Sequence, residues 1–172
     1  ILFNRFNYLH SNSFQIQDSI NSNFINFNLP FNYKTVALVG DSFGAYSTKF
    51  ILENKHVIKF EWKNEYKNFK LFDYLDKSNI EVIHDPDKNV CTCNKVDLLI
   101  IECSESEQRT LSLFLIFKDV VEEGGKLFII DSPRHQNVYI KERIKDKNYE
   151  LIEYETFFEV NLKQQNIVNE EN

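Results

Sequence analysis

One stretch decides the fold of this chain: Val36-Ala-Leu-Val-Gly-Asp-Ser-Phe-Gly-Ala-Tyr-Ser-Thr-Lys-Phe50. It begins as an apolar strand over 35–39, turns between Gly40 and Gly44, and continues as a helix from Ala45. The chain holds only 4 glycines, so two glycines in one turn indicate a backbone that side chains would obstruct. A strand that enters a helix through such a turn directs backbone N–H groups at the space above the strand. The stretch therefore predicts a ligand pocket at this point.

The composition is that of one globular domain. The 172 residues, with 42% hydrophobic and 15% aromatic side chains, are enough for a single core. No apolar run approaches the roughly 20 residues that a membrane helix needs. No basic segment precedes an apolar one near residue 1, so we expect no secretory signal. We interpret the 3 cysteines as reduced thiols and expect an intracellular protein, cytoplasmic or organellar. The net charge of −6 disfavours a general attraction to nucleic acid but leaves room for a local basic face.

Strand and helix patterns alternate along residues 34–162, which we interpret as one domain. Apolar, β-branched runs predict strands, with helices between them; the strands are 35–39, 56–60, 80–84, 96–101, 126–130, 149–155 and 157–162, and the helices are 45–54, 64–77, 105–122 and 137–147. This order predicts an α/β fold, a three-layer Rossmann-like sandwich with a mostly parallel seven-stranded sheet and a C-terminal antiparallel hairpin. Residues 1–33 form an Asn/Ser/Phe-rich extension that we expect to pack on the domain or a partner protein, and 163–172 form a polar tail.

The predicted carboxyl ends of the strands are mostly acidic. Ligands of such sheets bind at these ends, and the candidate binding residues there are Gly40, Asp41, Ser42, Gly44, Glu61, Trp62, Asp85 and Glu102. Glu61 ends the second strand about 20 residues after the glycine turn, where a carboxylate accepts both hydrogen bonds of a ribose diol. Asp85 suits an adenine amino group, or alternatively an Asx turn. The acidic rim disfavours a phosphate-rich ligand, which needs cationic donors.

These motifs, in this order, resemble the class I S-adenosylmethionine-dependent methyltransferases, and most closely the catechol-type O-methyltransferases. The matching segments are Leu38-Val39-Gly40-Asp-Ser-Phe-Gly44-Ala-Tyr46-Ser47, Asp97-Leu-Leu-Ile-Ile-Glu102 and Gly124-Gly125-Lys-Leu-Phe-Ile-Ile-Asp131. The resemblance covers residues 35–162. It implies that S-adenosylmethionine binds at the residues above together with Tyr46. It also implies methyl transfer to an oxygen or nitrogen atom of a small-molecule or macromolecular acceptor.

The sequence also departs from the family pattern. Leu38 stands where the family has an acidic residue that orients the amino group of the cofactor. The metal-dependent members use three residues that correspond to Glu102, Asp131 and Ser132, and Ser132 is a poor substitute for the family's Asn. We therefore expect no divalent metal, and we assign no catalytic residue. A second interpretation stays open: a catalytically inactive methyltransferase-like module, a pseudoenzyme, inside a larger assembly.

Basic residues gather in two regions away from the acidic rim. The first group is Lys141, Arg143, Lys145 and Lys147, and the second is Lys55, Lys59, Lys63, Lys67 and Lys70. We interpret both groups as solvated faces. Contact of the first group with RNA, or with an acidic partner, is the alternative.

Overall fold

In the computed structural model, the described residues are 31–40, 45–61, 79–84, 86, 94–102, 106–131, 137–155 and 157–163. Their strands are β1 (Thr35–Val39), β2 (His56–Glu61), β3 (Ile80–His84), β4 (Val96–Ile101), β5 (Val121–Ile130), β6 (Glu150–Glu153) and β7 (Phe157–Asn161). They form one seven-stranded sheet in the order β3-β2-β1-β4-β5-β7-β6. Within this sheet β7 runs antiparallel to both of its neighbours, and the other pairings are parallel. The predicted mostly parallel sheet with a C-terminal antiparallel hairpin is confirmed.

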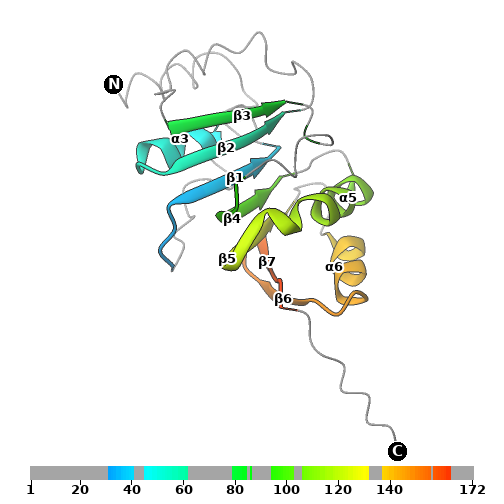
Figure 1. Cartoon of the computed structure of the whole chain (residues 1–172). Coiled ribbons are helices and arrows are strands. Elements are labelled where there is room, and N and C mark those ends of the chain that lie inside the picture. Colours follow the sequence, from blue (N-terminus) through cyan, green and yellow to red (C-terminus); the bar gives the residue numbers. More distant parts are fainter. Residues whose placement is uncertain are drawn as a thin grey trace, which may run out of the picture.

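Helices lie on both faces of the sheet (Figure 1). One face carries α3 (Ala45–Leu52), and the other carries α5 (Glu107–Phe117) and α6 (Val138–Lys145). Side chains of β4 alternate between the two apolar cores, because successive residues of a strand point to opposite faces. Leu98 and Ile100 pack on the α3 side, whereas Leu99 and Ile101 pack on the side of α5 and α6. Burial on both faces explains why this central strand is apolar almost throughout.

The helix predicted over 105–122 is shorter in the structure. Ser106 caps α5, its Oγ accepting a hydrogen bond from the Arg109 N–H at 3.1 Å. The helix ends at Phe117, a 3₁₀ helix (Lys118–Val120) follows, and Val121 already pairs with Val96 of β4. Both valines of 120–121 are β-branched and buried, so strand pairing prevails over continuation of the helix.

The glycine pair consequently lies inside β5 rather than before it, which corrects the predicted start of that strand. The pairing with β4 shifts register between Val121 and Lys126, so Gly124 and Gly125 lie in a bulged stretch. Gly124 adopts a positive φ of 82° there. The other described strands and helices match their predicted bounds to within two residues. The predicted helix at 64–77 and most of the loop at 85–89 lie outside the described residues.

Tyr33, the last residue of the predicted N-terminal extension, belongs to the folded core. Its side chain is 7% exposed, and its hydroxyl donates a hydrogen bond to Glu53 Oε2 at 3.2 Å. The ammonium of Lys55 donates to the Tyr33 carbonyl oxygen at 2.8 Å and lies 4.4 Å from the centre of the ring.

Among the helices in the described ranges, none is long and apolar enough to cross a membrane.

Candidate functional site

Three of the predicted site residues lie side by side, in register, at the ends of three adjacent strands. The last paired residue of β1 is Val39, which lies opposite Phe60 of β2 and Ile101 of β4. The residues that follow these three are Gly40, Glu61 and Glu102. Because β2, β1 and β4 are neighbours and parallel, these three positions form one row at the carboxyl edge of the sheet.

The ends of β1 and β4 are in direct contact. The Glu102 N–H donates a hydrogen bond to the Val39 carbonyl oxygen at 2.8 Å. Gly40 has a φ of 78°, and a Cβ atom placed on it would lie 1.8 Å from the Glu102 carbonyl oxygen. Only glycine fits at this position, so the first glycine of the predicted turn has a structural reason. A bare backbone is thereby kept at the centre of the row.

On the far side of the row, Glu61 ends β2 and pairs in register with His84, which ends β3 and is exposed. The ends of β2 and β3 therefore lie side by side at the carboxyl edge of the sheet. The remaining predicted site residues, Asp41, Ser42, Gly44, Trp62 and Asp85, lie outside the described residues.

The Tyr-Ser pair that follows the glycine turn is buried. Tyr46 is 3% exposed and Ser47 is fully buried in the first turn of α3. The Tyr46 ring belongs to the core on the α3 side, together with Leu38 and Phe50. Leu38 is 1% exposed, so the position that is acidic in the family faces the core here. These side chains anchor α3 to the sheet beneath the site.

Asp131, at the end of β5, has two partners that the sequence analysis missed. Its Oδ1 accepts a hydrogen bond from Asn137 Nδ2 at 2.8 Å and lies 3.9 Å from the Lys141 ammonium. Asn137 is 4% exposed and has a φ of 53°, which is uncommon for a residue other than glycine. Its only sequence signal is an Asn before a helix, which indicates a cap, yet it makes no side-chain capping bond.

These partners bear on the metal site that the resemblance raised. The Asp131 carboxylate already has an ammonium and an amide as neighbours, which suits a divalent cation poorly. Among the described residues, no group of three or more His, Cys, Asp or Glu side chains is arranged to hold a metal ion.

Asp97, which helped to identify the fourth strand, lies at its amino end, far from the row. Its Oδ2 accepts hydrogen bonds from the N–H groups of Lys34 and Thr35 at 2.6 and 2.9 Å, and from the Thr35 hydroxyl at 3.1 Å. Burial opposes ionisation of this carboxyl, but these bonds and one from Glu122 outweigh it and lower its pKa to about 2. Asp97 thus joins β4 to the start of β1.

Two expectations about basic residues change. Lys59 was assigned to a solvated face, but it is 1% exposed, because it alternates along β2 with the same orientation as the buried Val57. In α6, Lys141 lies 3.5 Å from Glu153, and Arg143 lies 3.6 Å from Asp146. Half of the predicted basic group of α6 and the turn that follows it therefore has acidic neighbours.

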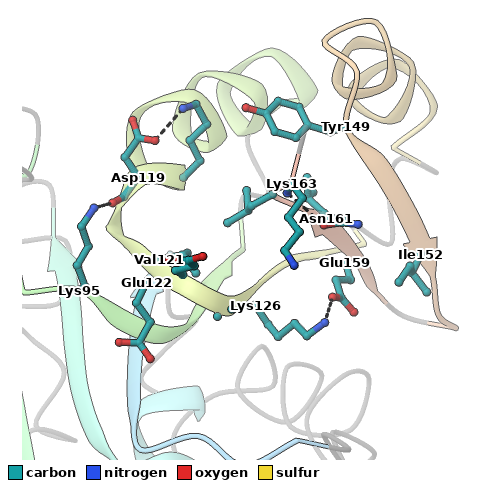
Figure 2. A pocket seen from close by; sticks show the side chains of 16 residues that line it. Lys95, Asp119, Val121, Glu122, Lys126, Tyr149, Ile152, Glu159, Asn161 and Lys163 are labelled. Atoms are coloured by element: carbon teal, nitrogen blue, oxygen red, sulfur yellow. Dashed lines mark hydrogen bonds and ion pairs between the residues drawn. The ribbon is translucent and has the colours of Figure 1, made fainter. Parts of the chain in front are cut away.

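A groove of about 560 Å³ lies at the opposite, amino edge of the sheet, beside the bulged start of β5 (Figure 2). Two ion pairs belong to its lining: Lys126 Nζ lies 2.5 Å from Glu159 Oε1, and Lys118 Nζ lies 2.8 Å from Asp119 Oδ1. None of the predicted site residues lines this groove.

No protein-family model matches the chain, and no curated protein sequence matches it. Solved structures do. An O-methyltransferase family protein from Burkholderia thailandensis has a TM-score of 0.57 at 10% identity, over 75% of this chain and 50% of that one. Precorrin-6y C5,15-methyltransferase from Geobacter metallireducens has a TM-score of 0.55 at 13% identity, over 77% and 80%. The fibrillarin/Nop5p complex has a TM-score of 0.54 at 12% identity, over 74% and 70%.

At these identities the likeness establishes the fold. The chain has the class I methyltransferase fold, a Rossmann-like α/β sandwich, and the predicted resemblance is confirmed at that level.

Proposed function

We propose that this chain binds S-adenosylmethionine at its row of strand ends and transfers the methyl group to an oxygen or nitrogen acceptor. The observation that carries the proposal is the level row of Gly40, Glu61 and Glu102 on β1, β2 and β4. A backbone without a side chain, flanked by two acidic positions, suits a cationic cofactor with a hydroxyl-rich sugar.

The proposed roles follow from position. Gly40 admits the cofactor close to the backbone, together with Asp41, Ser42 and Gly44 of the same turn. Glu61 accepts the ribose hydroxyls. Glu102 lies on the opposite side of β1 and faces the amino acid part of the cofactor, and Tyr46 supports the turn from the core. Trp62 and Asp85 contact the adenine.

S-adenosylmethionine, when bound, supplies a methyl group that is already activated by its sulfonium. The task of the protein is then to orient cofactor and acceptor and to exclude water. Because Asp131 is held by Asn137 and Lys141, we propose that transfer needs no divalent metal. The acceptor enters on the β4–β5 side, away from Glu61.

Calorimetric titration of the full chain with S-adenosylmethionine tests the proposal. We expect binding in the micromolar range and a loss of about 10- to 100-fold in Glu61→Ala, because two hydrogen bonds to a charged acceptor disappear. Glu81→Ala is the matched control, since Glu81 is an exposed glutamate on the neighbouring strand β3, away from the row. No heat at millimolar cofactor, or equal losses in both variants, would contradict the proposal.

One observation favours a second candidate, an inactive methyltransferase-like module. Leu38 is apolar and buried in the core, so this position supplies no carboxylate to a cofactor amino group. Binding without methyl transfer to any tested acceptor class, or no binding at all, would support the module.

The chain's partners are also proposals. We propose that residues 1–30, which are rich in Phe and Asn, contact a partner protein, because so many aromatic side chains suit an interface. Contact with RNA through α6 and the turn after it has weaker support, since Lys141 and Arg143 have acidic neighbours, although Arg143, Lys145 and Lys147 are exposed. A filter-binding titration with single-stranded RNA, repeated with Lys145→Glu, would test that contact.

A further inference from the structure

The strand β6 ends the sheet, and in the described part of the chain nothing pairs with its outer edge. The Tyr154 N–H donates a hydrogen bond to the Phe157 carbonyl oxygen at 2.9 Å, so the backbone of Tyr154 faces β7. Backbone groups alternate in direction along an antiparallel strand. Ile152 therefore also faces β7, and the N–H and C=O groups of Leu151 and Glu153 point outward.

The side chains of β6 alternate between the two faces of the sheet, with Leu151 and Glu153 on one face and Glu150 and Ile152 on the other. Glu153 lies on the α6 side, where its carboxylate is 3.5 Å from the Lys141 ammonium. Ile152 and Tyr154 lie on the other side and are 47% and 40% exposed, unusually high for large apolar residues of this protein. Ile152 stands on the rim of the amino-edge groove (Figure 2), and the Tyr154 ring stacks on Phe157 with centres 4.5 Å apart. Beyond Glu150, this face of the edge therefore offers two neighbouring apolar side chains.

The same edge is strongly acidic. Residues 149–155 read Tyr-Glu-Leu-Ile-Glu-Tyr-Glu and contain three carboxylates and no basic residue. All three glutamates are exposed, and Glu153 is 56% exposed at its side chain despite its contact with Lys141. Exposed edge strands pair readily with other chains, and charge decides which ones.

We propose that the outer edge of β6 binds an extended basic segment of a partner protein, which adds to the sheet as an eighth strand. Its backbone pairs with the outward groups of Leu151 and Glu153. Its alternate side chains are basic beside Glu153 and apolar over Ile152 and Tyr154. A second copy of this chain fits less well, because it would bring three more glutamates, and a molecule of net charge −6, to the same seam.

Fluorescence anisotropy with the full chain and a labelled peptide of alternating lysine and valine tests this inference. We expect saturable binding, little binding of the matching glutamate–valine peptide, and loss of binding when the peptide is N-methylated at the amides that would pair. Glu153→Lys should weaken binding about 5-fold or more, because an attraction becomes a repulsion. Leu151→Pro should abolish it by removing an outward N–H.

Glu81→Lys, on the opposite edge strand β3, is the matched control and should change the affinity little. Thermal unfolding of each variant separates loss of binding from loss of fold, and Glu153→Lys keeps the test decisive if Leu151→Pro does not fold. The inference is overturned if the acidic or N-methylated peptide binds equally well, or if Glu153→Lys and Glu81→Lys behave alike. It is also overturned if the chain sediments as a dimer that Glu153→Lys dissociates, since a second copy would then occupy the edge.

Discussion

Gly40 lies so close to the Glu102 carbonyl that a single added carbon atom would overlap it, at a separation of 1.8 Å. The contact joins the end of β1 to the end of β4 and keeps the centre of the row of strand ends free of side chains. Gly40 is therefore required both by the backbone conformation of the turn and by the tertiary contact with Glu102.

Alanine in place of Gly40 should therefore cost more stability than alanine in place of Gly124. Both glycines have positive φ values, 78° and 82°, so in both variants the left-handed backbone lowers the free energy of unfolding by about 1–2 kcal/mol. A Cβ atom on Gly124 meets nothing within 4 Å, whereas one on Gly40 meets backbone. We expect Gly40→Ala to lower the free energy of unfolding by about 1–3 kcal/mol more than Gly124→Ala, measured by urea denaturation. Equal losses would show that the close approach is relieved without cost.

The Asp97 carboxylate should stabilise the fold in a pH-dependent way. Its folded pKa of about 2 lies below the ordinary value of 3.8, so its contribution is complete above about pH 4 and is lost as the pH falls through 2. We expect Asp97→Ala to lower the free energy of unfolding by about 1–3 kcal/mol at pH 7, because the Lys34 and Thr35 N–H groups lose their acceptor.

The difference in free energy of unfolding between wild type and Asp97→Ala should become smaller in urea titrations run at successively lower pH, from pH 5 to pH 3. Asp119→Asn serves as the control. The Asp119 side chain is 77% exposed, so this substitution should change the free energy of unfolding by no more than about 0.5 kcal/mol. A gap that does not change with pH would mean that packing, and not charge, accounts for the effect of Asp97.

The ion pair between Lys126 and Glu159 should show strong coupling. The Glu159 side chain is 7% exposed, and its second oxygen accepts a bond from the Tyr154 hydroxyl at 3.4 Å. Lys126→Met leaves a buried carboxylate without its cation, at a cost of about 1–3 kcal/mol because Lys126 is itself 38% exposed. Adding Glu159→Gln should recover part of that loss.

A double-mutant cycle measures this coupling directly. The pair of Lys118 and Asp119, whose carboxylate is 77% exposed, is the control, with an expected coupling of about 0–1 kcal/mol. If both cycles give the same coupling, the burial of Glu159 does not strengthen its ion pair.

Asn137 should tolerate glycine better than alanine. Both substitutions remove the hydrogen bond to Asp131, but only alanine keeps a Cβ atom at a φ of 53°. We expect Asn137→Gly to be more stable than Asn137→Ala by about 1 kcal/mol, measured by thermal and urea unfolding. The reverse order would indicate that the Asn137 backbone changes conformation in the variants.

Local pattern was sufficient for much of the fold. The apolar run 96–101 predicted a central strand, and the structure buries its side chains on both faces. The glycine turn after 35–39 predicted where the first strand ends. These predictions hold because hydrophobic periodicity and backbone freedom are local properties that tertiary contacts rarely reverse.

The failures occur where distant pairing competes with a local preference. Residues 118–122 have helical character, but Val121 pairs with Val96 and begins β5 instead. Lys59 looks like a surface residue, yet its place in the alternation of β2 buries it. No local signal reports which strand will lie alongside, so such side chains change environment only when the sheet forms.

The candidate site shows the same division. From its residues alone, the chain indicated the acidic strand ends, the glycine at position 40 and the class of fold. Only the tertiary structure aligns Gly40, Glu61 and Glu102 side by side, because their alignment depends on the register of three strands that are far apart in sequence. It also gave Asp131 its partners Asn137 and Lys141, which reach it through the packing of α6 on the sheet. Sequence sets which groups are present, and packing sets which of them meet.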